Sequence, residues 1–153
     1  MSKVYVLVGV PGSGKSTWVE SQLWTNDCVY VSSDHFIDEE ASRQGKTYND
    51  VFKEYVTTAI SLMLDKVIVA REEGKDIIWD QTSVSVKSRK KKFSMLPDYE
   101  HIAVVFDTPA DDELMKRLSN RPGKSIPKEV VDSMIKTFEM PTEEEGYKEV
   151  WRT

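Results

Sequence analysis

Short apolar runs alternate with longer amphipathic stretches along this chain. Five of the short runs combine apolar and aromatic residues without helical spacing, which is typical of β-strands. They are Lys3–Val8, Cys28–Val31, Asp76–Trp79, Ile102–Phe106 and Glu149–Arg152. Helical patterns fall between these runs, and such alternation favours a parallel sheet covered by helices on both faces. The sequence therefore predicts an α/β fold, a three-layer sandwich with a five-stranded parallel sheet.

The clearest helical pattern begins after Thr47 and ends at Gly74. Apolar and aromatic residues recur there at steps of three and four, and we expect them to lie in the core. They are Phe52, Tyr55, Val56, Ala59, Ile60, Met63, Leu64 and Val67. Three further helices are expected over residues 18–24, over residues 110–119, and from Pro127, at the first helical position, to a point before Pro141.

The first predicted strand leads directly into a complete G-x-x-x-x-G-K-[ST] phosphate loop. The glycines of such a loop allow backbone N–H groups to converge on phosphate oxygens, its lysine reaches the β- and γ-phosphates, and the next hydroxyl ligates Mg²⁺. The preceding strand and the following helix, whose positive end faces the anion, favour this function over a structural turn. The chain is therefore predicted to bind a nucleoside triphosphate, with Mg²⁺ at Ser16. The nucleotide-binding residues are Gly9, Pro11, Gly12, Ser13, Gly14, Lys15, Ser16 and Thr17.

Two aspartates directly follow predicted strands. Asp34 comes after the second strand and Asp80 after the third. Ligands of open α/β sheets bind at the carboxyl ends of the strands, and a carboxylate there can accept the proton of an attacking hydroxyl. Asp34 is therefore a candidate general base, and Asp80 a second catalytic carboxylate that acts on the acceptor hydroxyl or on metal-bound water. Capping of the following helix is an alternative role for Asp34.

A cationic segment with a Pro-Gly turn lies between two predicted helices, at residues 116–125. In nucleotide kinases such a segment can close as a lid that brings guanidinium groups against the transferred phosphoryl group and excludes water. We expect this lid at about residues 117–126. Arg117 and Arg121 are four residues apart, so they share one face if the helix persists. The alternative is that both are exposed arginines, which the helix dipole favours near a C-terminus.

The composition is that of a soluble globular protein. The chain has 153 residues, of which 39% are hydrophobic and 31% charged, and we expect residues 1–153 to form one P-loop kinase domain. No apolar run approaches the length of a membrane span, and no signal-peptide pattern precedes the first strand. We therefore expect a cytoplasmic protein with no membrane partner, and no protein partner is inferred. Cys28 is expected to be a small core residue of a strand.

The distribution of charge bears on nucleic-acid binding. The formal net charge of −5 argues against extensive coating of nucleic acid. A basic run is the local exception, and two interpretations of it stay open, a solvated helix face or a surface that tracks the backbone of a nucleic-acid acceptor. The run consists of Lys87, Arg89, Lys90, Lys91 and Lys92.

Several motifs together resemble the kinase domain of bacteriophage 5′-polynucleotide kinase, across nearly the whole chain. They are Pro11–Trp18, Asp34, Asp80-Gln81-Thr82, Lys116-Arg117, Arg121, Lys124, Ile126-Pro127, Val130 and Ser133-Met134. The resemblance implies a P-loop NTPase-type sheet in the strand order 2-3-1-4-5. It also implies phosphorylation of 5′-hydroxyl ends of DNA or RNA by ATP and Mg²⁺, in the host cytoplasm if the protein is phage-encoded.

The same resemblance implies roles for individual residues. Asp34 matches the general base of the family and Asp80 an active-site carboxylate. Arg121 matches the arginine that stabilises the transferring phosphate, and Arg117 a further phosphate-contacting position. One position departs from the pattern: Ile37 stands where the family has an arginine that holds a phosphate of the acceptor. The acceptor therefore differs, or Arg43 or Lys46 supplies this contact.

These observations predict an enzyme that transfers the γ-phosphate of ATP to the 5′-hydroxyl of a nucleic-acid end. Lys15, Asp34, Asp80 and Arg121 are its expected catalytic residues. The chain has no D-x-D-G-T phosphatase motif, so we do not expect it to remove phosphate by that route. A kinase for a nucleoside, nucleotide or sugar is the alternative, favoured by the net acidity and Ile37. A third class is an ATP-gated binding module, which needs neither Asp34 nor the lid arginines.

Overall fold

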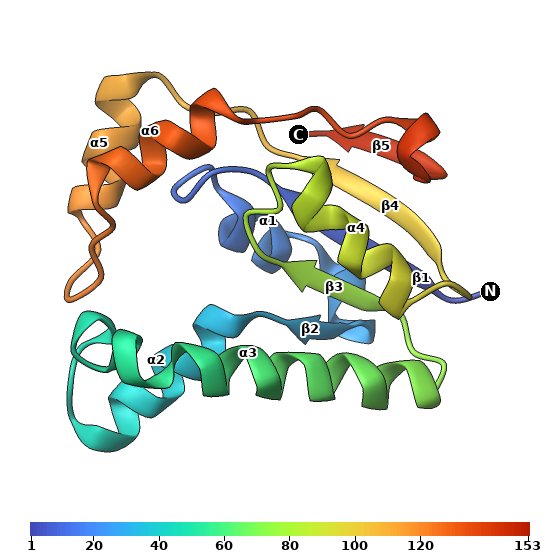
Figure 1. The fold of residues 1–153 in the computed structure, drawn as a ribbon, viewed down its shortest axis with the longest axis horizontal. Coiled ribbons are helices and arrows are strands. Elements are labelled where there is room, and N and C mark those ends of the chain that lie inside the picture. Colours follow the sequence, from blue (N-terminus) through green and yellow to red (C-terminus); the bar gives the residue numbers. More distant parts are fainter.

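A five-stranded parallel sheet forms the centre of the computed structural model, which describes residues 1–153 (Figure 1). The strands are β1 (Lys3–Val8), β2 (Val29–Val31), β3 (Ile77–Asp80), β4 (Glu100–Val105) and β5 (Glu149–Arg152). Their order is β2-β3-β1-β4-β5, which confirms the predicted order. All of β1 after Lys3 is buried, because this central strand is covered on both faces, and it therefore reads as an unbroken apolar run.

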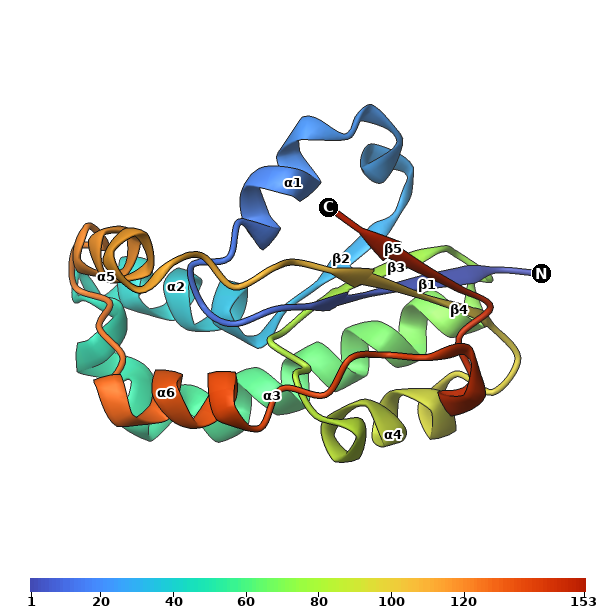
Figure 2. The same ribbon diagram turned by 90° about the horizontal axis from the view of Figure 1, so that it is seen from above.

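Helices cover both faces of the sheet, as predicted. They are α1 (Lys15–Ser21), α2 (Ser33–Gln44), α3 (Tyr48–Glu72), α4 (Val86–Met95), α5 (Asp111–Ser119) and α6 (Lys128–Lys136), with short 3₁₀ turns at η1 (Leu23–Asp27) and η2 (Glu143–Glu145). Figure 2 shows α1 on one face of the sheet and α3 and α4 on the other. None of the helices has both the length and the apolar character that a membrane crossing requires.

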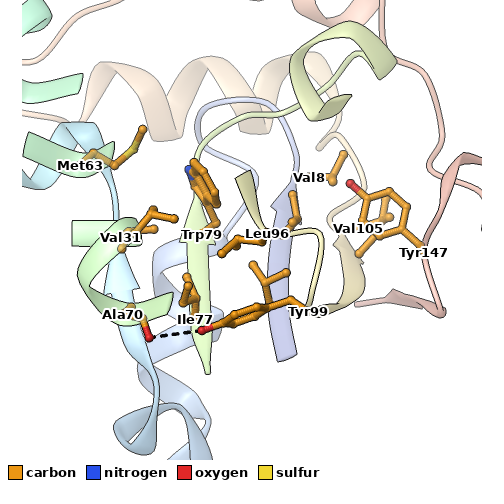
Figure 3. Packing of buried hydrophobic residues seen from close by; sticks show 14 residues of the cluster. Val8, Val31, Met63, Ala70, Ile77, Trp79, Leu96, Tyr99, Val105 and Tyr147 are labelled. Carbon is orange, nitrogen blue, oxygen red and sulfur yellow. Dashed lines mark hydrogen bonds between the residues drawn. The ribbon is translucent and has the colours of Figure 1, made fainter. Parts of the chain in front are cut away.

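The larger core cluster lies between the sheet and helices α3 and α4 (Figure 3). Trp79 from β3, Met63 from α3 and Leu96 after α4 meet there. The Tyr99 hydroxyl at its edge donates a hydrogen bond to Lys75 O at 2.6 Å. The opposite face of the sheet has its own cluster, in which aromatic side chains of α1 and η1 cover β1 and β4. The sheet is therefore held by two separate apolar layers.

Helix α3 follows its predicted bounds but buries a partly different face. Its start is fixed by a capping box between Thr47 and Asp50, and Gly74 with a φ of 67° follows its end. Two of the residues expected in the core, Phe52 and Ile60, are 41% and 38% exposed. The buried positions are Val51, Ala59, Met63, Val67 and Ala70. The difference arises because α3 packs against α2 at its start and against the sheet further along, so its buried stripe shifts.

Three smaller expectations differ from the structure. The helix expected over residues 18–24 ends at Ser21, because Gln22 is extended and a separate 3₁₀ turn follows. Pro127 is the N-cap of α6 and not its first residue. Cys28 is half-buried and precedes β2, so its expected position within a strand is wrong. It still packs at the edge of the cluster beneath α1.

Candidate active site

A cleft of about 1350 Å³ lies at the carboxyl ends of β1, β2 and β3. It brings together every site residue predicted from the sequence except Gly9. These residues are Pro11, Gly12, Ser13, Gly14, Lys15, Ser16, Thr17, Asp34, Asp80, Arg117 and Arg121. They come from four parts of the chain, which are the loop after β1 with α1, helix α2, the end of β3, and helix α5 with the lid. Parallel strands place their carboxyl ends at one edge, which is why these distant segments converge.

The loop between β1 and α1 has the geometry of a phosphate cradle. Gly12 and Gly14 have φ values of 81° and 98°, a left-handed backbone that glycine adopts without strain. The Lys15 ammonium donates to Gly9 O at 2.8 Å and to Val10 O at 3.1 Å. The Ser13 hydroxyl is buried in the cleft wall and has no hydrogen-bond partner of its own. The loop can therefore offer donors to an anion such as a triphosphate.

Gly9 supports this loop from behind and does not line the cleft. Its N–H donates to Thr82 O at 2.9 Å, which ties the loop to the segment after β3. A Cβ at Gly9 would lie 2.5 Å from Ser13 Oγ and 3.0 Å from Phe106 Cβ. Close packing therefore requires glycine at position 9. This position behind the loop does not favour the direct contact with nucleotide that we expected.

Burial changes the proton affinity of the loop lysine. It lowers the pKa of Lys15 to about 8, and the nearby carboxylates of Asp80 and Asp34 offset part of this effect. A buried ammonium is costly unless anions compensate for its lost hydration. The carboxylates compensate for part of the lost hydration of the Lys15 ammonium, and phosphate oxygens would compensate for more of it.

Asp80 is the better buried of the two predicted carboxylates. It ends β3, in register with Leu7 of β1, and it accepts a hydrogen bond from the Tyr30 hydroxyl. Burial raises the pKa of Asp80, whereas the hydrogen bond from Tyr30 and the charge of Lys15 act in the opposite direction. The Asp80 carboxylate thus lies beside the phosphate loop, and Tyr30 of β2 holds it there.

Asp34 lies in the first turn of α2 and also lines the cleft. The N-cap of that helix is Ser32, so Asp34 does not cap it, and the capping alternative loses its basis. The Tyr48 hydroxyl donates to Asp34 Oδ1 at 2.6 Å, and Lys124 Nζ lies 3.6 Å from Asp34 Oδ2. With 54% of its side chain exposed, Asp34 is accessible to a second substrate.

The residues present fit Mg²⁺ bound together with a triphosphate. Ser16 lines the cleft next to Lys15 in the chain, and Asp80 lines the same cleft. No group of three or more His, Cys, Asp or Glu residues forms a metal cage. Mg²⁺ is usually bound by one or two protein oxygens, substrate phosphates and water, which matches this donor set.

The two lid arginines reach the cleft in different ways. Arg117 Nη1 donates to Gly12 O at 3.0 Å, and its Nε pairs with Glu113 at 2.9 Å. Arg121 lies beyond the end of α5 at Ser119, so the helix does not persist and the two arginines do not share a helical face. Both nevertheless line the cleft, in contrast to the alternative of purely solvent-facing arginines.

The cleft and its immediate surroundings contain residues that sequence reasoning did not assign. Lys124 lies 3.7 Å from Asp38 as well as beside Asp34, and Tyr30 and Tyr48 hold the two candidate carboxylates. Lys124 could have been suspected from its position in the cationic segment. The tyrosines carried no signal, because each belongs to an element remote in sequence from the carboxylate that it contacts.

The substitutes suggested for the missing arginine are wrong. Ile37 is 1% exposed and packs with Ala41 in the core between α2 and α3. Arg43 pairs with Glu40, and neither Arg43 nor Lys46 lines the cleft. The reason is helical geometry: the face of α2 that carries Asp34 toward the cleft differs from the face that carries Ile37 toward α3.

The basic run lies in α4, and the structure gives no support to its predicted role in tracking an acceptor. Arg89 is fully buried and pairs with Glu145 at 2.7 Å. Lys92 is also buried, with its ammonium 5.0 Å from the centroid of the Trp79 ring. Neither residue belongs to a solvated face, although Lys87, Lys90 and Lys91 are exposed. None of the run lines the cleft.

Comparisons with known proteins agree with this fold. The chain is 26% identical to a bifunctional polynucleotide phosphatase/kinase of Schizosaccharomyces pombe, over 97% of this chain and 32% of that protein. It therefore spans about a third of the length of this curated relative. A solved structure of the Pnkp1/Rnl/Hen1 RNA repair complex matches with a TM-score of 0.67 and 27% identity, over 89% of this chain and 43% of the other.

A sugar kinase from Janibacter sp. HTCC2649 shares the fold at 18% identity, with a TM-score of 0.61 over 99% of this chain and 86% of the other. The family model described as AAA domain matches residues 4–141. This match includes the phosphate loop, both aspartates and the lid. The chain therefore belongs to this AAA domain family and has the P-loop kinase fold.

Proposed function

We propose that this protein transfers the γ-phosphate of ATP to the 5′-hydroxyl of a DNA or RNA end. The observation that carries the proposal is the meeting of Lys15, Asp34 and Arg121 around one cleft. An anion cradle faces an accessible carboxylate there, which is the arrangement that phosphoryl transfer to a hydroxyl requires. The resemblance to bacteriophage polynucleotide kinase and the name of the yeast relative support the choice of acceptor.

The phosphate loop binds the triphosphate in this proposal. Backbone N–H groups from Gly12 to Ser16 and the Lys15 ammonium hold the β- and γ-phosphates. The Ser16 hydroxyl would hold Mg²⁺, and Asp80 would orient water at the metal. When bound, Mg²⁺ offsets the negative charge on the β- and γ-phosphate oxygens. Arg117 and Arg121 contact the same phosphates from the lid.

Asp34 then acts on the acceptor. Its carboxylate takes the proton as the acceptor oxygen attacks the γ-phosphorus. A bond forms between that oxygen and phosphorus, and the bond from phosphorus to the β–γ bridging oxygen breaks, so that ADP leaves with the electron pair. Arg121 offsets the charge on the three equatorial oxygens during transfer. The proton remains on Asp34 until solvent removes it.

Transfer from γ-labelled ATP to a panel of acceptors tests this proposal. The panel contains oligonucleotides with 5′-hydroxyl ends in DNA and RNA, nucleoside 3′-monophosphates, nucleosides and sugars. We expect label on the 5′ end of an oligonucleotide, and none on an oligonucleotide that already carries a 5′-phosphate. ATP-dependent binding of an oligonucleotide without any transfer would instead identify an ATP-gated binding module.

A small-molecule kinase is the second candidate, and the acceptor side of the cleft favours it. The cation there, Lys124, already lies between Asp34 and Asp38, and Ile37 is buried where the family has an arginine. This side of the cleft is therefore better suited to hydrogen bonds with a neutral acceptor than to binding an acceptor phosphate. Label on a nucleoside or sugar, with unlabelled oligonucleotides in the same panel, would establish this second function.

A further inference from the structure

Tyr48 contacts the proposed base from outside the cleft. Its hydroxyl donates to Asp34 Oδ1 at 2.6 Å, yet Tyr48 does not line the cleft. More than half of the Asp34 side chain is exposed, and an exposed carboxylate with no fixed partner samples several rotamers. The hydrogen bond from Tyr48 therefore selects one orientation of the carboxylate.

Tyr48 is itself held firmly. It is the first residue of α3 and directly follows Thr47, the cap that accepts a hydrogen bond from Asp50 N at 3.2 Å. Its ring lies 5.6 Å from the Phe52 ring and packs on the apolar cluster that joins α2 to α3. Burial and the hydrogen bond to Asp34 raise the pKa of the Tyr48 hydroxyl, so it remains a donor at neutral pH.

The second oxygen of the carboxylate faces the lid. Lys124 Nζ is 3.6 Å from Asp34 Oδ2 and 4.3 Å from the centroid of the Tyr48 ring. The residue after Tyr48 anchors the neighbour of Lys124, because Asn49 N donates to Gly123 O at 2.9 Å. Figure 1 shows the loop between α5 and α6 reaching toward the start of α3. The carboxylate and the lid thus share one support at the start of α3, through Tyr48 and Asn49.

We propose that Tyr48 is a positioning residue that fixes the Asp34 carboxylate for proton transfer. This proposal rests on the proposed function, since it requires Asp34 to be the base. A carboxylate has about four acceptor sites on its two oxygens, so Asp34 can accept from Tyr48 and still receive the acceptor proton. Orientation of a reacting group raises the rate of the chemical step. Loss of the Tyr48 hydroxyl is therefore expected to lower kcat and to leave KM for ATP unchanged.

A double-mutant cycle tests this coupling. Transfer is measured for the wild type, Tyr48→Phe, Asp34→Asn and the double variant, each at saturating ATP with the best acceptor of the panel. We expect Tyr48→Phe to lower kcat about tenfold in the wild-type background and less than about twofold in the Asp34→Asn background. If no panel member accepts phosphate, the cycle is run on ATP hydrolysis, in which water is the attacking group.

The matched control is Tyr55→Phe, since Tyr55 lies on the same helix and in the same cluster but away from the cleft. We expect Tyr55→Phe to leave kcat unchanged, with melting temperatures of both single variants near the wild type. An equal loss from Tyr48→Phe in both backgrounds, or no loss in either, would overturn the positioning role. Full transfer by Asp34→Asn would instead show that Asp34 is not the base. That result contradicts the proposed function itself and is distinct from a failure of the positioning role.

Discussion

Lys15 is a buried cation in a site built for anions. Its ammonium donates to two carbonyl oxygens of its own loop, Gly9 O and Val10 O. Burial nevertheless lowers the pKa of Lys15 to about 8. Its charge therefore changes within a pH range that is accessible to binding experiments, and this gives a direct test of its part in triphosphate binding.

Affinity for ATP should fall as the pH rises through about 8, because the protonated form of Lys15 attracts phosphate and the proton leaves at this pH. Calorimetric measurement of Kd from pH 7 to pH 9.5 checks this expectation. Lys15→Arg is the matched control: an arginine stays charged throughout, so its Kd should remain level. A wild-type Kd that stays constant over the same pH range would show that the charge of Lys15 does not contribute to ATP binding.

Asp34 and Asp38 lie one helical turn apart, and both contact Lys124, which makes them a matched pair. General bases typically contribute about 10²–10⁴-fold, so Asp34→Asn should lower kcat by that order with little change in ATP affinity. Asp38→Asn removes the same charge beside Lys124 without removing the base, and its effect should be smaller. Equal losses in the two variants would show that local charge matters and that proton transfer to Asp34 does not.

At the scale of elements, helix α4 supports the site through its buried arginine. The Arg89 guanidinium donates to Ser83 O at 2.8 Å and to Glu139 O at 2.9 Å, and it forms two contacts with Glu145. Ser83 has a φ of 47°, an uncommon conformation for a residue other than glycine. Arg89 thus fastens the segment after β3, which holds the phosphate loop through Thr82.

Removal of one partner from this buried pair should destabilise the protein strongly. Glu145→Gln leaves the Arg89 charge uncompensated, and such losses typically cost about 3–5 kcal/mol. Urea unfolding measures the change in the free energy of unfolding. The exposed lysines of the same helix are the control, and a triple substitution of Lys87, Lys90 and Lys91 by Ala should change this free energy by about 0.5 kcal/mol or less for each lysine. Similar effects of the two changes would contradict a structural role for Arg89.

At the scale of the whole molecule, the core contains a buried lysine, Lys92. Burial lowers the pKa of Lys92 to about 8, and the nearby charges of Arg89 and Lys91 add to this effect. Its ammonium lies over Trp79, and the hydrogen bond that it donates, to Ser88 O at 3.4 Å, is long. The folded protein therefore releases this proton more readily than the unfolded chain does.

Stability should consequently rise with pH between about 8 and the ordinary lysine value of 10.5, since the unfolded chain binds more protons over that window. One proton contributes at most about 1.4 kcal/mol per pH unit. Lys92→Met removes this contribution, while Lys15 keeps its own. Urea unfolding at several pH values from 7.5 to 9.5 should therefore show a smaller rise for Lys92→Met than for the wild type. Identical slopes would mean that Lys92 does not titrate in this range.

The architecture and the phosphate side of the site could be predicted from the sequence. The strands and the long helix α3 follow from local spacing, and the phosphate loop is a contiguous motif whose backbone conformation is set by its own glycines. Asp34 and Asp80 were found because polar residues at the ends of parallel strands gather at one edge of the sheet. In these cases the residues that determine the local structure lie within a few positions of the pattern that predicts it.

The sequence by itself thus determined the fold class, the strand order that its family resemblance implied, and the cleft edge at which the candidate residues meet. Only the tertiary structure decided which face each helix buries. It placed Arg89 and Lys92 inside, where residue type alone suggested contact with an acceptor or with solvent. It also brought Tyr48 to Asp34, which no spacing indicates. The reason is that the burial and partners of a side chain depend on the elements packed against it, and these come from distant parts of the chain.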